Sequence, residues 1–585
     1  MAARTYAPEI SWDSEVRQYL EAALGPQKLA EISAALARPP LATCLRVNTL
    51  RTSPQDLLRR LPEALAPEDR ALLETNPAYV HPLLPDAVIL PGTGPHAVDY
   101  SRTRGLEVVV GRKAGESVMR GAHVFAPGML AVSPGIEKGD LVAVSVGLEL
   151  PGSDRYAYTR GTVLGSEHEA KQVEALGGQA PDRSRLFIGI GRAELSRTEF
   201  FQGRGGIAVT MLERVFRTPG CGDILPGDFM LQNVCSLVAA HVLAPRPGAR
   251  VLDMCAAPGG KTTALAQLMG DRGEVVAFDR SHAKAAEVRR LAGSFGLTCV
   301  KAYKMDATKA VLQPVPQPGP ELVPQQQQEQ QEKEHGEATG AAAGAAAVAA
   351  AVAAGAGGAS PAEASSSGCG AGAQVGEVAA AVPSGGGESA VESRGRRGGR
   401  TQPPSAATLR RLERIAASRQ ARGLDPAPSP HLAEGKEAAA PGFPPASFDH
   451  VLCDAPCTAL GLRPRLVHRQ TLRELDQTAA YQRKLLRVAV ALVRPGGALV
   501  FSTCSINPGE NEANVRWLLD TFPGMRLVQQ APRLGQPGLT GNVVLPCGRT
   551  QQLLSEKEAA LVQRFDPSAP LDTIGFFVAK FEKDA

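Results

Sequence analysis

Two segments of the sequence place a cysteine directly after an apolar, strand-like run. FDHVLCDAPCT carries Cys457 behind Asp454, and GALVFSTCS carries Cys504. Ligands of an open α/β sheet bind at the carboxyl ends of its strands, so both thiols fall where chemistry is expected. A lone cysteine at a strand end is usually a small buried hydrophobe, and we interpret three others in that way. These are Cys235, Cys299 and Cys453.

A thiolate at this place suits one reaction in particular. Cytosine C5 is a poor nucleophile, but a thiolate that adds to C6 makes C5 enamine-like, so that C5 accepts a methyl group from a sulfonium. Loss of the C5 proton and expulsion of the sulfur then restore the aromatic ring. Asp454 would orient the base by accepting from its exocyclic amine, and Lys261 would bring positive charge to the same cavity. The spacing alone does not decide whether Cys457 or Cys504 attacks.

A loop rich in small residues, DMCAAPGGKTT, lies between a strand-like and a helix-like segment. Small residues let the backbone approach a bound ligand closely. The closing GKT suggests a phosphate-binding loop, but that motif needs glycine where Cys255 stands, and GxGxxG is absent. The loop is therefore predicted to bind a cofactor that is neither a nucleoside triphosphate nor a nicotinamide. Its candidate residues are Cys255, Ala256, Ala257, Pro258, Gly259, Gly260 and Lys261.

Two further carboxylates end the next strand-like runs, Asp279 after EVVAF and Asp306 after CVKAYKM. An acid at the first of these places can hold ribose hydroxyls. Carboxylates at successive strand ends suit an adenosine that bears two hydroxyls and a cationic amino acid. Alternatively, Asp279 and Asp306 only cap the helices that follow them.

Composition excludes several classes of protein. The ten cysteines are scattered and form no CxxC pair, which disfavours structural zinc and a disulfide scaffold, and no metal site is predicted. The first twenty residues lack an apolar signal core. Only the Ala/Gly tract near 341–358 is long enough to span a bilayer, and its side chains are too small for that. We expect a cytoplasmic protein, with nuclear presence left open. The net charge of +4 is compatible with a polyanionic partner.

The order of the patterns predicts an α/β fold interrupted by other segments. Helix-like and strand-like runs alternate over 210–310 and again after 447, which indicates βαβ units and a parallel sheet. Short β-rich runs before them indicate a small barrel. The Gln/Glu-, Ala/Gly- and Ser/Arg-rich stretch between the two halves is predicted to be a disordered insertion. The predicted units are 1–104 (mixed α/β, RNA-binding), 105–205 (barrel), 206–311 and 447–585 (the two parts of the catalytic domain) and 312–446 (insertion).

At this point the motifs resemble a known family. DMCAAPGGKTT, LCDAPCTALG, QRKLL, RPGGALVFSTCSI and the ENE at 510–512 are similar to those of the Sun-domain RNA cytosine-5 methyltransferases. RGAHVFAPGML and KGDLVAVSV resemble a PUA domain, and its position ahead of the catalytic domain resembles the branch of the sixth family member. The resemblance implies a Rossmann-like methyltransferase domain that uses S-adenosyl-L-methionine, preceded by a β-barrel PUA domain. It covers nearly the whole chain outside 312–446.

Carried over by position, the resemblance implies that Cys504 adds to cytosine C6 and that Cys457 aids release of the covalent adduct. It also implies that residues 255–261, Asp279, Asp306 and Asp454 bind the cofactor. The implied substrate is a cytosine near the 3′ end of the tRNA acceptor stem, with the PUA domain reading the CCA end. Lys113, Arg120 and Lys138 are candidate RNA contacts, although each one taken alone is better interpreted as a solvated surface charge than as a specific contact.

Alternatives remain open for the substrate. The same reaction could take place on messenger or ribosomal RNA. A further alternative is a non-catalytic RNA-binding factor in which the methyltransferase domain is only a scaffold. We expect a monomer and no membrane association. The insertion contains the arginine-rich SRGRRGGR, which would add salt-sensitive RNA affinity, but a solvated spacer is our preferred interpretation.

Overall fold

The fold is taken from a computed structural model of the chain. It describes residues 6–150, 155–178, 182–202, 206–222, 224–312 and 442–585. The predicted disordered insertion, 312–446, lies almost wholly outside these residues. Its two ends come together on the sheet, because Val311 and Phe443 form a parallel bridge. No helix among the described residues is long and apolar enough to cross a membrane.

The largest sheet has eight strands in the order β14-β13-β12-β15-β16-β21-β17, with β20 paired to β21. The first five are parallel, β21 is antiparallel to β16, and β17 and β20 each pair antiparallel with β21. The chain reverses direction across the sheet between β12 and β15, which makes their carboxyl ends the switch point where ligands bind. The strands are β12 (Arg250–Asp253), β13 (Glu274–Asp279), β14 (Val300–Lys304), β15 (Phe448–Asp454), β16 (Val493–Thr503), β17 (Met525–Leu527), β20 (Gln563–Phe565) and β21 (Phe576–Lys583).

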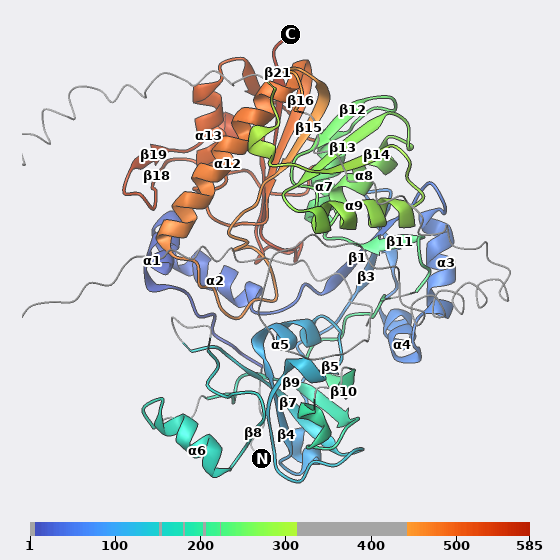
Figure 1. Cartoon of the computed structure of the whole chain (residues 1–585), viewed down its shortest axis with the longest axis vertical. Coiled ribbons are helices and arrows are strands. Elements are labelled where there is room, and N and C mark those ends of the chain that lie inside the picture. Colours follow the sequence, from blue (N-terminus) through green and yellow to red (C-terminus); the bar gives the residue numbers. More distant parts are fainter. Residues whose placement is uncertain (1–5, 151–154, 179–181, 203–205, 223, 313–441) are drawn as a thin grey trace, which may run out of the picture.

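Helices cover both faces of this sheet, and Figure 1 shows the two layers on either side of the strands. The alternation of side chains along each strand supplies the two cores. In β12, Val251 packs with Leu237 of α7 and Leu265 of α8, whereas Leu252 packs with Leu485 of α12. The helices are α7 (Val234–Leu243), α8 (Gly260–Leu268), α9 (His282–Ser294), η4 (Ala307–Lys309), α12 (Leu472–Leu492), α13 (Glu512–Thr521) and α14 (Glu556–Ala559), and a small ribbon is formed by β18 (Asn542–Val544) and β19 (Thr550–Gln552). The predicted α/β fold is confirmed.

The N-terminal part forms a small four-stranded sheet in the order β11-β1-β3-β2. The edge strand β11 comes from a segment far along the chain, and its Leu231 pairs with Leu45 of β1. The amphipathic runs predicted as helices are α1 and α2, and α1 packs against the C-terminal ribbon. The elements are α1 (Ser14–Leu24), α2 (Pro26–Leu36), β1 (Ala42–Val47), α3 (Pro54–Ala64), α4 (Pro67–Thr75), β2 (Tyr79–Val80), β3 (Ala87–Pro91) and β11 (Phe229–Leu231).

The β-rich module has seven strands in the order β5-β10-β9-β7-β4-β6-β8 and lies below the large sheet in Figure 1. Strand β10 follows residue 205, where we predicted the catalytic domain to begin. The structure corrects that boundary, because β10 pairs with β9 and β5 of the module. The elements are η1 (Tyr100–Thr103), β4 (Glu107–Gly111), α5 (Arg112–Met119), β5 (Val124–Phe125), η2 (Ala126–Gly128), β6 (Met129–Val132), β7 (Leu141–Gly147), β8 (Thr162–Val163), α6 (Glu167–Glu174), β9 (Phe187–Ala193), η3 (Glu199–Phe201) and β10 (Ile207–Arg214).

Candidate active site

The two motif cysteines meet at the carboxyl ends of neighbouring strands. Cys457 follows β15, Cys504 follows β16, and their Sγ atoms are 3.2 Å apart. Both side chains are partly exposed, whereas Cys235, Cys299 and Cys453 are buried as expected. The hydrogen bond with Cys504, burial, and then the charges of Cys504 and Glu510 raise the pKa of Cys457 well above its usual range. One of the two thiols therefore donates its S–H to the sulfur of the other.

A buried carboxylate ties the two cysteine loops together. Glu510 Oε2 accepts hydrogen bonds from the Thr458 amide at 2.9 Å and from Gln482 Nε2 at 3.0 Å. Its Oε1 accepts from Ser505 Oγ at 2.8 Å, from Asn507 Nδ2 at 3.2 Å and from the Thr458 hydroxyl. Thr458 follows Cys457, and Ser505 follows Cys504. The side chain of Glu510 therefore fixes the loop that carries Cys457 relative to the loop that carries Cys504.

An ion pair lies at the same strand ends. Lys261 Nζ is 2.7 Å from Asp454 Oδ2, and the two side chains are 13% and 25% exposed. Asp454 Oδ1 also accepts from Ser502 Oγ at 2.6 Å, and Lys261 donates to Ser236 Oγ at 3.1 Å. Lys261 and Asp454 are therefore in direct contact, and the expectation that they line one cavity stays a prediction. Their catalytic and cofactor-binding roles stay predictions.

The loop of residues 255–261 bends tightly between β12 and α8. Gly259 has φ +109°, and a Cβ there would stand 3.2 Å from Leu291 Cδ2 and from the Val288 Cα. This close approach to α9 and the left-handed backbone explain why glycine is needed. Cys255 is the first residue of this loop, and burial raises the pKa of its thiol well above the usual range. It is therefore a poor nucleophile compared with a thiol in a polar setting.

The predicted carboxylates differ in their local role. Asp279 accepts from the Ala257 amide at 3.2 Å and from the Arg280 amide at 2.7 Å, and α9 is capped by Ser281 instead. Asp306 is the N-cap of η4 and accepts from the Thr308 amide. Helix capping thus explains Asp306 in part, but it does not explain Asp279.

These residues fit S-adenosyl-L-methionine. Both oxygens of Asp279 accept only one backbone N–H each, so acceptor capacity remains for a pair of ribose hydroxyls. The small residues of the loop leave room for backbone contact, and the carboxylates suit a cationic ligand. Asp253, at the end of β12, is 1% exposed, and burial raises its pKa to about 7. Its Oδ2 accepts from Thr262 Oγ1 at 2.7 Å, which orders the start of α8.

A buried charge cluster joins the β-rich module to the chain between β15 and α12. Arg112 of α5 donates to Glu149 at 2.9 Å and to Glu116 at 2.9 Å. Glu116 Oε1 also accepts from the Leu466 amide at 3.1 Å, and Arg469 lies 3.5 Å from Glu149. The side chains of Arg112, Glu116 and Glu149 are 5–8% exposed. The module is therefore fixed to the segment that follows Cys457.

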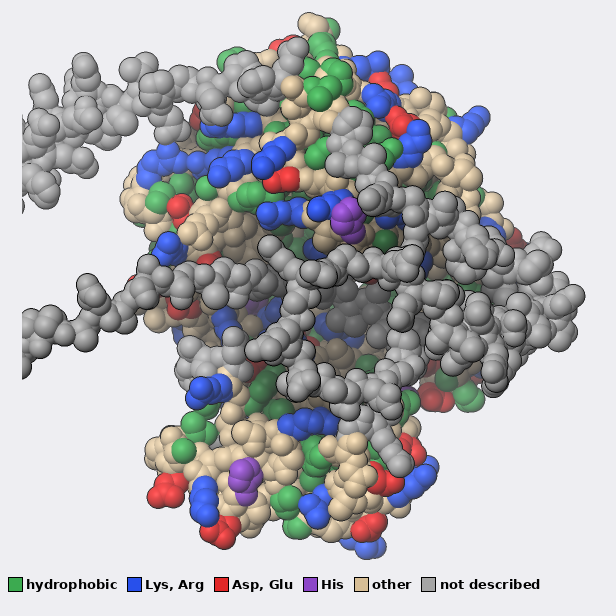
Figure 2. Space-filling view, in the orientation of Figure 1, with side chains coloured by type: hydrophobic (Ala, Val, Ile, Leu, Met, Phe, Trp, Pro, Cys, Tyr) green, Lys and Arg blue, Asp and Glu red, His purple; other side chains and the backbone are tan. Residues whose placement is uncertain are grey.

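The three predicted RNA contacts all lie on the surface of the β-rich module. Lys113 and Arg120 stand at the two ends of α5, and Lys138 lies between β6 and β7. Contact with RNA stays a prediction for each. A further row of Lys and Arg side chains crosses the region of α12 on the face seen in Figure 2. Helix α12 carries Arg483, Lys484 and Arg487, which the sequence analysis did not single out.

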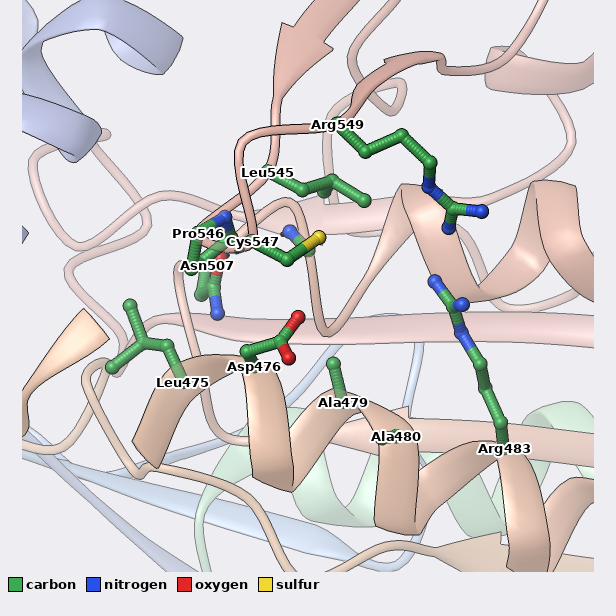
Figure 3. A pocket seen from close by; sticks show the side chains of 11 residues that line it. Leu475, Asp476, Ala479, Ala480, Arg483, Asn507, Leu545, Pro546, Cys547 and Arg549 are labelled. Atoms are coloured by element: carbon green, nitrogen blue, oxygen red, sulfur yellow. Dashed lines mark hydrogen bonds between the residues drawn. The ribbon is translucent and has the colours of Figure 1, made fainter. Parts of the chain in front are cut away.

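A cavity of about 160 Å³ opens beside α12, and Figure 3 shows its lining side chains. The floor is formed by residues of α12, and the opposite wall by the loop of residues 545–549. Asn507 and Gly509, from the loop after Cys504, also line it. Neither motif cysteine belongs to its lining. The cavity is thus a neighbour of the cysteine site and separate from it.

Sequence reasoning missed the residues that support the cysteines. Glu510 was noted only as part of a family motif, and Thr458 and Gln482 were given no role. The available signal was the run Glu510-Asn511-Glu512 at the start of a helix, where all three side chains are fully buried. Three polar residues in a row are rarely buried without partners. Their partners, however, lie elsewhere in the sequence.

Comparison with known proteins agrees with this geometry. Residues 240–315 and 410–582 match the 16S rRNA methyltransferase RsmB/F family, and residues 107–177 match the PUA domain. The rRNA (cytosine-C(5))-methyltransferase NOP2C of Arabidopsis thaliana is 40% identical over 98% of this chain and 91% of its own length. The tRNA (cytosine(72)-C(5))-methyltransferase NSUN6 of Mus musculus is 30% identical over 98% and 97%. In fold, the chain resembles NSun6 from Pyrococcus horikoshii, solved with SFG, with a TM-score of 0.60 and 24% identity over 98% and 99% of the two chains.

Proposed function

The chain belongs to the RsmB/F family of RNA cytosine-5 methyltransferases and uses S-adenosyl-L-methionine, and from that premise we propose that it methylates a cytosine in the tRNA acceptor stem, near the CCA end. The observation that carries the chemistry is the pair of sulfurs 3.2 Å apart at two parallel strand ends, beside the glycine-rich loop. We propose Cys504 as the nucleophile and Cys457 as the residue that aids release.

In this proposal the chain's own groups act in sequence. Cys504, as a thiolate, forms a bond to cytosine C6, and the electron pair of the C5=C6 bond becomes available at C5. Asp454 accepts from the exocyclic amine, and Lys261 holds Asp454 in place through the 2.7 Å ion pair. S-adenosyl-L-methionine, when bound, supplies an electrophilic methyl group. After C5 has taken a methyl group, its proton passes to a water molecule, the C5=C6 bond re-forms, and Cys504 departs as a thiolate that accepts a hydrogen bond from Cys457.

The PUA domain supports a structured RNA end as the substrate. A cytosine in a stem must leave its stack before a thiolate reaches C6, so the enzyme needs contacts that hold the surrounding RNA. The charge cluster on Arg112 fixes the PUA domain to the segment after Cys457, so RNA held by one is presented to the other. Lys113, Arg120 and Lys138 are proposed to contact that RNA. The cytoplasmic location and the monomeric state stay predictions.

Ribosomal RNA is a second candidate substrate. NOP2C of Arabidopsis thaliana is an rRNA methyltransferase and shares 40% identity with this chain along nearly its full length, against 30% for the mouse tRNA enzyme. Both relatives match 98% of this chain, so the domains that they share with it do not decide between tRNA and rRNA as the substrate.

A direct comparison separates these substrates. The full chain is incubated with S-adenosyl-L-methionine and equal amounts of tRNA transcripts, rRNA fragments and structured messenger RNA, followed by bisulfite sequencing. We expect methylation of an acceptor-stem cytosine that is lost when the CCA end is removed. Methylation confined to rRNA would replace the tRNA proposal by the second candidate, and methylation confined to messenger RNA would contradict both.

A further inference from the structure

The two cysteines stand in unlike electrostatic surroundings. Glu510 is bonded to the backbone amide and hydroxyl of Thr458, directly beside Cys457, and its charge is among the causes that raise the pKa of Cys457. On the other side, the Arg465 guanidinium interacts with Cys504, while its own pKa is lowered mainly by burial. An anion therefore acts on Cys457, and a cation acts on Cys504.

The hydrogen bonds favour the ionised form of Glu510. Burial is the largest effect and leaves the pKa of Glu510 above its usual value, while the surrounding groups oppose that effect because they donate to the carboxylate. The Thr458 amide can only donate. Gln482 is fixed as a donor as well, since its Oε1 accepts from Asn514 Nδ2 at 2.8 Å and its Nε2 also donates to the Pro456 carbonyl at 3.0 Å. Oε2 of Glu510 thus has two donors and no acceptor for a proton of its own.

The remaining charged groups near Glu510 do not cancel its effect on Cys457. Tyr19 of α1 is buried nearby, and the charges of Glu510 and Glu512 contribute to raising its pKa, so it stays neutral. Arg564 is paired with Glu512 at 2.9 Å and donates to the Ile506 carbonyl. Its charge is therefore largely neutralised by Glu512. Glu510 itself forms no ion pair among the described residues.

We propose that Glu510 is a positioning residue that makes the two cysteines unequal: its buried carboxylate binds both cysteine loops and keeps Cys457 a neutral thiol that donates its S–H to the Cys504 sulfur. This inference rests on the proposed function, in which Cys504 attacks and Cys457 assists. A neutral donor 3.2 Å away stabilises negative charge on Cys504 both before attack and on departure. No net proton passes between the sulfurs in either step.

Thiol alkylation of the RNA-free full chain tests this proposal. Iodoacetamide reacts with thiolates, and peptide mass spectrometry gives an initial rate for each cysteine between pH 6 and pH 10. In the unsubstituted protein, Cys504 should react before Cys457 at pH 8. In Glu510→Gln, Cys457 should react about tenfold faster, because the carboxylate charge beside its loop is gone. Exposed Cys547 (Figure 3) serves as an internal reference whose rate should not change.

Two variants separate charge from packing. Asp520→Asn removes a carboxylate of the helix that follows Glu510, at a side chain that is 63% exposed, and it should leave the Cys457 rate within about twofold of the original. Glu510→Asp keeps the carboxylate charge, but its shorter side chain cannot contact both loops. The alkylation rate of Cys457 should therefore stay low while kcat falls. Glu510→Gln should lower kcat about tenfold or more, with KM for RNA nearly unchanged.

Defined results would overturn the proposal. One is a folded Glu510→Gln variant whose Cys457 rate is unchanged. If that variant does not fold, faster alkylation of Cys457 than of Cys504 in the unsubstituted protein would overturn it equally. These measurements need no RNA. A wrong substrate or a wrong methylation mechanism would therefore show in the methylation assay while leaving the alkylation result intact.

Discussion

The ion pair between Lys261 and Asp454 gives a quantitative prediction. At 2.7 Å the attraction between unit charges is about 6 kcal/mol for an effective dielectric constant near 20. Loss of hydration offsets much of it, because the side chains are only 13% and 25% exposed. A net coupling of about 2 kcal/mol remains, between the value of an exposed pair and that of a buried one.

Lys261→Met and Asp454→Asn should each lower kcat/KM by about 30-fold, since each removes one placed charge from the site and about 2 kcal/mol corresponds to about 30-fold. Because the two groups act as a unit, the double variant should lose about 30-fold as well, instead of about 1,000-fold. The assay is transfer of a labelled methyl group into RNA under single-turnover conditions. Lys284→Met, at an exposed position of α9, is the matched control. Losses that multiply in the double variant would refute the view that Lys261 acts through Asp454.

Three further changes have defined outcomes. Gly259→Ala should weaken S-adenosyl-L-methionine binding, measured by calorimetry, at least tenfold, because φ is +109° and the added Cβ would stand 3.2 Å from Leu291 Cδ2 and from Val288 Cα. The control variant Gly293→Ala adds a Cβ in open space and should bind the cofactor normally. Arg112→Met should destabilise the protein by about 3 kcal/mol in denaturant unfolding, since it removes the cation that two buried carboxylates share, and a loss below about 1 kcal/mol would contradict that interpretation. The pKa of Asp253 is raised to about 7, so its proton stabilises the fold at low pH and this contribution is lost as pH rises through about 7. Asp253→Asn should therefore gain Tm relative to the original protein between pH 5 and pH 8, and a constant difference would count against the raised pKa.

Much of the site follows from local sequence. Apolar runs that end in Asp253, Asp279, Asp454 or Cys504 predict strands, and parallel strands bring their carboxyl ends to one edge. The prediction that Cys457 and Cys504 both lie at this edge needs nothing more. The preference for one of them as the nucleophile came from family resemblance, because both follow strands of the same kind.

What the sequence could not predict depends on contacts between distant segments. Glu510 meets Thr458 and Gln482 only after β15, α12 and β16 have packed together. Strand β10 was assigned to the wrong side of a boundary for a similar reason, since its partners β9 and β5 belong to the module before it. Local patterns identify a strand, but they do not identify the sheet that it joins.

The division of labour between the cysteines is tested most directly by trapping the covalent adduct. Cys457→Ala, Cys504→Ala and the unsubstituted chain are mixed with substrate RNA and S-adenosyl-L-methionine, denatured in SDS and separated by electrophoresis. If Cys504 attacks C6 and Cys457 aids its release, Cys457→Ala accumulates a protein–RNA adduct and Cys504→Ala forms none. An adduct that accumulates with Cys504→Ala and is absent with Cys457→Ala would contradict the mechanism.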